Sequence, residues 1–260
     1  MKRQFRRGTC FKFYKHNSST DTIVLIHGLG LNLEVWNWQI PFYSDYNVLV
    51  YDLRGHGDST KARSKPSLSD FVNQLDDLFN YLQIRRAILI GFSLGAMIAR
   101  KFAIEFSHKV KKLIMLNSPN KQSTSEKEEV EKRSKLVLNK GPAVTADAAI
   151  ERWYTNSFRT KNEQMINLTK FWIQANERIT YSTISPILYF GSLELHGNFC
   201  NLPTLILTCD EDFANGPVST YKIAEYFPNS KVVILKGLRH MALIESPESV
   251  NHEIQKFLNS

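Results

Sequence analysis

The sequence RAILIGFSLG, residues 86–95, decides the fold that we predict for this chain. Its first half is an apolar run typical of a buried parallel strand, and residues 94–106 have the pattern of a helix. Ser93 stands between them, with Gly91 two positions before it and Gly95 two positions after it. Glycines let the helix pack close to the strand, and a serine on such a tight turn is typical of a nucleophile elbow. We therefore expect strained backbone at Ser93, with the N-terminal amides of the helix pointing to the space beside its hydroxyl.

Segments typical of strands and helices alternate on both sides of this stretch. Apolar runs predict strands at residues 11–16, 22–26, 47–51, 86–90, 112–116, 204–208 and 231–235. Helical spacing predicts helices at 68–82 (with Ser67 or Ser69 as the N-cap), near 218–226 and at 247–258. Continuous apolar strands joined by helices indicate an α/β protein, with a mostly parallel central sheet covered by helices on both faces.

The alternation stops after Pro119 and resumes near Pro203. Residues 121–195 have the pattern of helices, charged at first and then rich in aromatic side chains, without clear strands. We therefore predict a core domain in two parts, residues 1–120 and 196–260, with residues 121–195 as a helical cap inserted between them.

Composition excludes several classes of function. The 260 residues carry a formal net charge of +8, but the basic residues are scattered or interleaved with glutamates, and no aromatic base-stacking surface accompanies them. We therefore expect a solvated basic surface and no nucleic-acid partner. No stretch approaches the ~20 apolar residues of a membrane span, and the N-terminus has no signal-peptide pattern. The three cysteines show no metal-site or disulfide spacing, which is typical of a reducing compartment, and we expect a cytoplasmic protein.

A nucleophilic serine needs a base, and His240 is the candidate. It directly follows Gly237-Leu238-Arg239, just after the last predicted strand. Ligands and catalytic groups gather at the carboxyl edge of a parallel sheet, where this loop is expected to lie.

The base needs an acid to orient it, and three acidic residues follow the strand 204–208. Of Asp210, Glu211 and Asp212, we predict Asp212 as the orienting acid, with Asp210 as the alternative. The loop after strand 112–116 begins with Asn117 and carries no carboxylate, which favours the later loop.

An oxyanion hole is predicted from the backbone amides of Leu29 and Leu94. Leu29 lies in His27-Gly28-Leu29-Gly30, after strand 22–26, where glycines allow close approach to a ligand. We expect His27 to be a structural histidine, and residues 52–59 to form a structural turn. No nucleotide-binding or metal-binding motif is present, so we expect no cofactor and no metal.

Taken together and in this order, these motifs resemble the α/β-hydrolase superfamily over nearly the whole chain. Residues 27–30, residues 52–59, the Ser93 elbow, Asp212 and residues 237–240 carry the likeness. Within the superfamily, the chain resembles the small, lidded esterase and lactonase branch, which includes 3-oxoadipate enol-lactonases and pimeloyl-carrier-protein methyl ester esterases. Residues 150–158 are similar to a segment of the enol-lactonase cap. The resemblance implies the α/β-hydrolase fold, with the helical cap inserted after the sixth strand.

The resemblance and the motifs predict a cofactor-independent serine hydrolase that cleaves a carboxylic ester or lactone of a small molecule through an acyl-enzyme on Ser93. Two alternatives stay open: a hydrolase of carbon–carbon bonds in diketones with the same three residues, and a weakly catalytic receptor for a small ligand.

Four large side chains are candidates for lining a substrate pocket. Trp36, Met97, Trp153 and Trp172 are candidates for contact with substrate, and the hydrophobic core is the alternative place for each. If the enol-lactonase likeness extends to the substrate, Arg152 or Arg178 could receive its carboxylate, but an exposed place on a helix face is the interpretation that we prefer for each. The sequence carries no indication of an oligomeric state.

Overall fold

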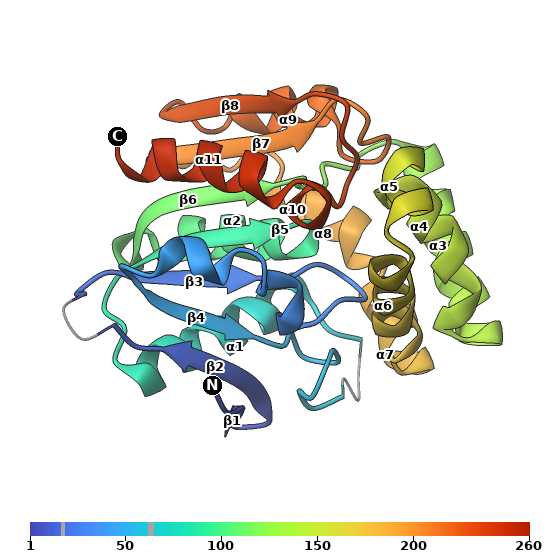
Figure 1. The fold of residues 1–260 in the computed structure, drawn as a ribbon, viewed down its shortest axis with the longest axis horizontal. Coiled ribbons are helices and arrows are strands. Elements are labelled where there is room, and N and C mark those ends of the chain that lie inside the picture. The colour runs from blue at the N-terminus through green and yellow to red at the C-terminus, as the bar shows by residue number, and fades with distance from the viewer. Residues whose placement is uncertain (17–18, 62–64) are drawn as a thin grey trace.

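The computed structural model describes residues 1–16, 19–61 and 65–260. Within them, eight strands form one sheet in the order β1-β2-β4-β3-β5-β6-β7-β8 (Figure 1). The strands are β1 (Gln4–Arg6), β2 (Thr9–Tyr14), β3 (Thr22–Ile26), β4 (Asn47–Tyr51), β5 (Ala87–Phe92), β6 (Val110–Leu116), β7 (Thr204–Cys209) and β8 (Ser230–Leu235). All pairs from β4 to β8 are parallel, whereas β2 pairs antiparallel with both β1 and β4.

The N-terminal hairpin corrects the expected first strand. Strand β2 runs from Thr9 to Tyr14, not over residues 11–16, and a short strand that was not predicted, β1, precedes it. Arg7 and Gly8 connect the two with φ of 43° and 78°, which is the backbone of a tight two-residue hairpin turn. β1 is mostly exposed and polar, so it lacks the apolar run by which the other strands are predicted.

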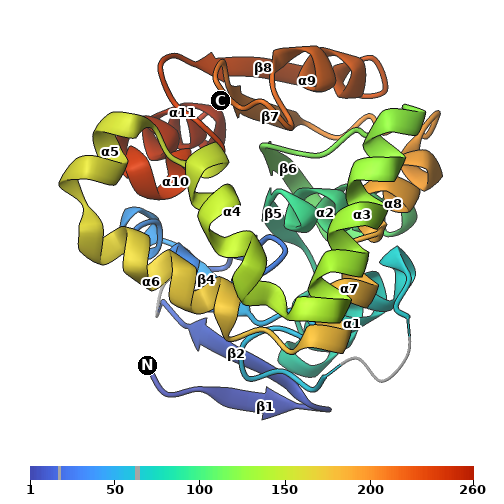
Figure 2. The same ribbon diagram turned by 90° about the vertical axis from the view of Figure 1, so that its right-hand side faces the viewer.

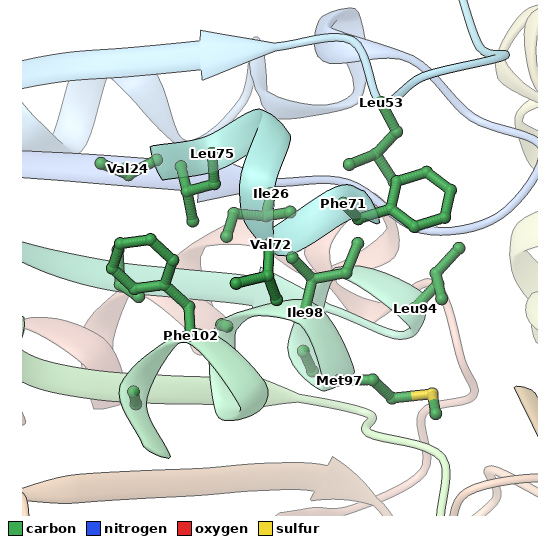
Figure 3. Close-up of a cluster of buried hydrophobic side chains, with 14 of the residues drawn as sticks. Val24, Ile26, Leu53, Phe71, Val72, Leu75, Leu94, Met97, Ile98 and Phe102 are labelled. Atoms are coloured by element: carbon green, nitrogen blue, oxygen red, sulfur yellow. The ribbon is translucent and has the colours of Figure 1, made fainter. Parts of the chain in front are cut away.

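Helices cover both faces of the sheet. Helices α1 (Leu68–Leu82), α2 (Leu94–Glu105) and α9 (Pro217–Ala224) pack on one face, and α10 (Ala242–Glu245) and α11 (Pro247–Leu258) pack on the other. Strand β3 shows the alternation, since Val24 and Ile26 contact the first layer while Ile23 and Leu25 contact the second. Figure 3 shows the first layer, where Val72 of α1 and Ile98 of α2 lie over Ile26. The predicted fold class, an α/β fold with a mostly parallel sheet between helices, is confirmed.

The connection between β3 and β4 contains no α-helix. Two short 3-10 helices, η1 (Leu33–Trp36) and η2 (Ile40–Tyr43), fill it instead. Asn32 caps η1 by accepting a hydrogen bond from the amide of Glu34 at 2.9 Å. A third such turn, η3 (Ser107–Lys109), leads into β6.

The helical cap stands between β6 and β7, after the sixth strand as expected. Its elements are α3 (Thr124–Lys140), η4 (Pro142–Thr145), α4 (Ala146–Trp153), α5 (Asn156–Lys161), α6 (Glu163–Gln174), α7 (Arg178–Ile184) and α8 (Ile187–Leu195). The parallel strands point toward these helices in Figure 1, and Figure 2 views the sheet through them. The division of the chain into domains at residues 121 and 195 stays a prediction. No helix in the described ranges has the length and apolar character needed to cross a membrane.

Candidate active site

Ser93 lies on a strained turn between β5 and α2. Its φ of 53° and ψ of −117° are rarely adopted by a residue with a side chain. The turn depends on its two glycines: a Cβ on Gly91 would stand 2.3 Å from the Gly95 carbonyl oxygen, and one on Gly95 would stand 2.0 Å from that of Ile26. Strand β6 also holds the turn, because the Ser93 amide donates to the Leu116 carbonyl at 2.9 Å.

Asp212 and His240 form a buried pair in the loops after β7 and β8. The imidazole Nδ1 lies 2.7 Å from Asp212 Oδ2, and the two residues are only 4% and 5% exposed. Asp212 Oδ1 accepts hydrogen bonds from the amides of Ala214 and Asn215, both at 3.1 Å. Burial raises the pKa of the Asp212 carboxyl, but the His240 charge and the hydrogen bonds from His240, Asn117 and the Asn215 amide outweigh it and lower the pKa overall. The carboxylate is therefore ionised and fixes the orientation of the imidazole.

The other acidic residues of this loop face different partners. Asp210, the alternative acid, accepts a hydrogen bond from the Gly237 amide at 2.8 Å and lies 3.6 Å from the Lys236 ammonium group. Glu211 pairs with Arg239 at 3.4 Å. Within the described residues, Asp212 is the member of this group that contacts the imidazole.

Aromatic side chains place His240 beside the serine elbow. The imidazole packs on Phe92, whose ring centroid is 4.9 Å away and whose backbone leads directly into Ser93. The imidazole also contacts Trp153 of the cap helix α4, whose ring centroid is 5.9 Å away. Ser93 itself is 8% exposed, and its hydroxyl makes no hydrogen bond to any residue in the described ranges. In structures without substrate, hydrogen bonds between catalytic groups are often long or poorly aligned.

The loop after β3 lies against the same elbow. A Cβ on Gly28 would stand 3.1 Å from Ser93 Cβ, so the glycine permits this contact. His27 Nε2 accepts a hydrogen bond from the Leu53 amide at 2.9 Å, which leaves Nδ1 to donate to the Gly28 carbonyl at 2.8 Å. Burial, followed by the neighbouring His56, lowers the pKa of His27 well below its usual value, so the ring is neutral as this arrangement requires.

The His27 hydrogen bond also sets the direction of the Leu29 amide. In a trans peptide the carbonyl and the following N–H point in opposite directions, so a Gly28 carbonyl turned to His27 turns the Leu29 N–H away from it. The amides of Leu29 and Leu94 donate to no acceptor within the described part of the protein. The cap braces this loop, since Asn176 donates to the Gly30 carbonyl at 3.0 Å and Tyr181 packs where a Gly30 Cβ would stand.

Asn117 belongs to this site, and the sequence did not predict it. Its side-chain amide donates to Asp212 Oδ2 at 2.8 Å, the same oxygen that His240 contacts. Asn117 is 2% exposed, and its φ of 49° lies in the left-handed region that asparagine tolerates better than most residues. The signal available in the sequence was an asparagine at the end of a predicted strand, at the same sheet edge as Asp212.

The four candidate pocket residues lie in different surroundings. Trp153 contacts His240, and Trp172 packs edge-on against Trp38 with 6.5 Å between ring centroids. Trp36 and Met97 have no exposed surface and pack within the two layers of the core. Whether any of the four contacts substrate stays a prediction.

The side-chain carboxylate of Asp52 holds the turn at residues 52–59. Asp52 accepts hydrogen bonds from the amides of Leu33 and Asp58, at 2.8 and 2.9 Å. His56 packs edge-on against His27, with 5.3 Å between ring centroids. Residues 1–16, 19–61 and 65–260 contain no group of three or more His, Cys, Asp or Glu side chains that could hold a metal ion.

Comparisons with known proteins concern the fold and the sequence as a whole. A family model described as the alpha/beta hydrolase fold matches residues 21–135. The (E)-2-((N-methylformamido)methylene)succinate hydrolase of Acinetobacter baylyi is 26% identical over 250 residues, which cover 95% of this chain and 94% of that protein. The 3-oxoadipate enol-lactonase 2 of the same organism is 24% identical over 234 residues, which cover 90% and 86%. The crystal structure of the enol-lactonase from Burkholderia xenovorans matches with a TM-score of 0.90 at 20% identity and covers 100% of both chains.

The order and direction of the strands and the match to the Burkholderia structure show that the protein has the α/β-hydrolase fold, and the family model covers residues 21–135 of it. The resemblance predicted from the sequence motifs is thereby confirmed, and an enol-lactonase is among the relatives of this chain.

Proposed function

We propose that this protein is a cofactor-independent serine hydrolase that cleaves a carboxylic ester or lactone through an acyl-enzyme on Ser93. The observation that carries the proposal is the buried 2.7 Å contact between Asp212 and His240, beside a serine in strained backbone. Hydrolases that act on unrelated substrates share this order of nucleophile, acid and base along the chain. The substrate must therefore be found by experiment.

The proposed mechanism assigns one step to each group. His240 Nδ1 is held by Asp212, so the proton of Ser93 passes to Nε2 as the hydroxyl oxygen attacks the substrate carbonyl. The amides of Leu29 and Leu94 donate to the oxyanion, a contribution of roughly 3 kcal/mol per donor in comparable sites. His240 then protonates the leaving alcohol, and a water molecule repeats the sequence to release the acid.

We expect the cap to limit access of water to the site. Trp153 covers the imidazole, while Tyr181 and Asn176 hold the loop that carries Leu29. Exclusion of water strengthens the hydrogen bonds to the oxyanion and limits side reactions. A substrate must therefore enter between cap and core, which favours a small molecule.

The test is hydrolysis of a panel of p-nitrophenyl esters, aliphatic lactones and diketones by the wild type and by Ser93→Ala. We expect multiple turnovers of at least one ester or lactone by the wild type, and a loss of kcat of roughly a thousandfold or more in the variant. Full activity in Ser93→Ala would contradict the proposal. Turnover of diketones alone would indicate the carbon–carbon hydrolase, and release of one equivalent without turnover would indicate the receptor.

A further inference from the structure

Arg239, which directly precedes His240 in the chain, connects three segments around the candidate active site. Its Nη1 donates to the Glu151 carbonyl at 2.7 Å and to the Tyr154 carbonyl at 3.2 Å, both in the cap. Its Nε lies 3.4 Å from Glu211, in the loop of the orienting acid. Only 19% of the Arg239 side chain is exposed. One guanidinium group thus joins the loop of the base, the loop of the acid and the cap.

The cap carbonyls in these contacts lie at the end of helix α4. The helix ends at Trp153, and the last carbonyls of a helix have no partner within it. Arg239 binds the carbonyls of Glu151 and Tyr154, and its charge complements the negative end of the helix dipole. The Met241 amide donates to the Trp153 carbonyl at 2.9 Å. These two donors flank the candidate base in the chain, so the end of α4 is tied to the catalytic loop on both sides of the imidazole.

Helix α10 holds the same part of the cap. Thr155, the N-cap of α5, donates through its amide to the Glu245 carboxylate at 3.1 Å. Its hydroxyl donates to the other oxygen of that carboxylate. The junction between α4 and α5 is therefore fixed to the segment that follows His240, in addition to its contacts with Arg239 and Met241.

Trp153 links the position of this junction to the position of the base. Asp212 holds the imidazole at Nδ1 alone, which leaves the ring able to turn about that hydrogen bond. Two aromatic side chains limit this motion: Phe92 and Trp153, with ring centroids 4.9 and 5.9 Å from that of the imidazole. Because Trp153 belongs to the cap, its place beside the imidazole depends on the contacts at the end of α4, of which Arg239 supplies two.

The ion pair with Glu211 does not by itself account for the arginine. The two groups are 3.4 Å apart and 44% of the Glu211 side chain is exposed, and such pairs contribute little to stability. The guanidinium also lies over the Phe213 ring, with Cζ 5.2 Å from the ring centroid. A planar group that stacks on a ring and donates in its own plane suits arginine, and lysine cannot reproduce this combination.

We propose that Arg239 is a positioning residue, which holds the end of α4 so that Trp153 keeps the His240 imidazole in place at the serine elbow. The inference rests on the proposed hydrolase function, because the position of the base matters for the rate only if His240 takes the Ser93 proton. A displacement of about 1 Å in an active site can lower the rate roughly a hundredfold. Since Arg239 acts through its neighbours, its loss should slow the chemical step and leave the binding of substrate unchanged.

The kinetic test compares Arg239→Gln with the wild type on the best p-nitrophenyl ester. We expect Arg239→Gln to lower kcat roughly tenfold or more, with KM within about twofold of the wild-type value. Arg239→Lys keeps the charge and should recover part of the lost kcat, which guards against a glutamine variant that folds poorly. Far-UV circular dichroism checks that each variant is folded.

Two further variants are the controls. Lys236→Gln removes an exposed cation of the same loop, whose carboxylate partner Asp210 is 3.6 Å away, and should keep kcat within about twofold. Glu211→Gln removes the ion pair of Arg239 but leaves its bonds to the cap carbonyls, and should also keep kcat within about twofold.

A proton NMR spectrum of the protein without substrate separates positioning from a general loss of structure. We expect the proton in the short buried hydrogen bond between His240 and Asp212 to resonate far downfield, and its absence from Asp212→Asn identifies it. In Arg239→Gln the resonance should broaden or shift, because the imidazole becomes free to turn and its proton exchanges faster with water. Lys236→Gln should leave it unchanged.

The inference is overturned if Arg239→Gln keeps the wild-type kcat or the wild-type resonance. It is also overturned if Glu211→Gln lowers kcat as much as Arg239→Gln does, since the ion pair would then be what matters. A higher KM at unchanged kcat in Arg239→Gln would contradict it as well, because Arg239 would then contact the substrate.

Failure of the hydrolase proposal would give a different result. If the wild type cleaves no ester, or if Ser93→Ala cleaves esters as well as the wild type does, the function assigned to Ser93 is wrong. The spectrum still tests Arg239, because it is measured without substrate. A changed resonance in Arg239→Gln would support its effect on the imidazole, and an unchanged one would overturn it.

Discussion

Asp212 and Asp210 lie two positions apart in one loop, yet their carboxylates have different partners. Asp212 accepts from His240, while Asp210 accepts from the Gly237 amide. In Asp212→Asn the amide cannot stabilise the imidazolium and favours the wrong tautomer of the ring, so we expect kcat to fall roughly a thousandfold or more. The measurement is steady-state hydrolysis of the best p-nitrophenyl ester, with KM little changed.

Asp210→Asn is the matched control for this prediction. It alters the same type of residue in the same loop, so a loss of activity through loop disorder would appear in both variants. We expect Asp210→Asn to keep kcat within about threefold, because its lost partners are one amide and an exposed lysine. A larger loss in Asp210→Asn than in Asp212→Asn would assign the acid to Asp210.

Residues that lie in a sequence motif could be predicted, whereas a contacting residue outside any motif could not. Ser93 stands between two glycines after an apolar strand, and His240 and Asp212 follow predicted strands. Asn117 carries no motif, and its bond to Asp212 joins positions 95 residues apart. Such a contact depends on the register of β6 beside β7, which strand patterns do not give.

At the scale of elements, the contact of helix α2 with strand β3 depends on Gly95. Alanine is the better helix former by about 1 kcal/mol, so propensity alone predicts that Gly95→Ala stabilises the protein. The added Cβ would, however, meet backbone, 2.0 Å from the Ile26 carbonyl oxygen and 2.6 Å from that of His27. Since neither chain segment can move without disturbing the sheet, we expect a loss of about 3 kcal/mol in the free energy of unfolding, measured by urea denaturation.

Gly197→Ala provides the comparison for Gly95→Ala. Gly197 has a φ of 78°, and a Cβ there would have no atom within 4 Å. Gly197→Ala should therefore lower the free energy of unfolding only by the cost of placing alanine in left-handed backbone, about 1–2 kcal/mol. If Gly95→Ala proves as stable as the wild type, the close packing of α2 on β3 is not what requires the glycine.

Elements with local signals were predicted well, and those without them were not. Helix α1 begins and ends where its spacing predicts, because Ser67 and Asp70 form a capping box and one apolar face packs on the sheet. Helix α11 also has the predicted bounds, because its apolar residues recur at helical spacing. The cap was predicted only as a helical region. Helix α3 shows why: only Val130 and Val137 of its 17 residues are buried, so no apolar stripe marks its ends.

At the scale of the whole molecule, two buried histidines link stability to pH. His27 and His56 are 0% and 1% exposed and pack against each other. Burial lowers the pKa of His56 to about 4, and burial followed by the charge of His56 lowers that of His27. Both are neutral in the folded protein, whereas the unfolded chain takes up protons near its ordinary pKa of about 6.5.

The consequence is a loss of stability on the acid side. Below pH of about 6.5 the unfolded state binds more protons than the folded state, so the free energy of unfolding falls as pH is lowered, down to the folded pKa of about 4. Each histidine contributes a slope of up to about 1.4 kcal/mol per pH unit in this window. Above about pH 7 both histidines are neutral in the folded and in the unfolded state, so they no longer make the free energy of unfolding depend on pH.

His56→Phe tests this origin of the acid sensitivity. The His56 Nε2 has no hydrogen-bond partner within the described residues, and its Nδ1 lies 3.3 Å from the Arg54 carbonyl oxygen, so a phenyl ring loses little. We expect the free energy of unfolding of this variant, measured by urea denaturation between pH 7.5 and 5, to depend less steeply on pH than that of the wild type. The difference should be about the slope that one proton taken up on unfolding contributes. His252→Gln, at an exposed position of α11, should keep the wild-type slope. An unchanged slope in His56→Phe would mean that other groups cause the sensitivity, because the buried pair would then take up no protons on unfolding.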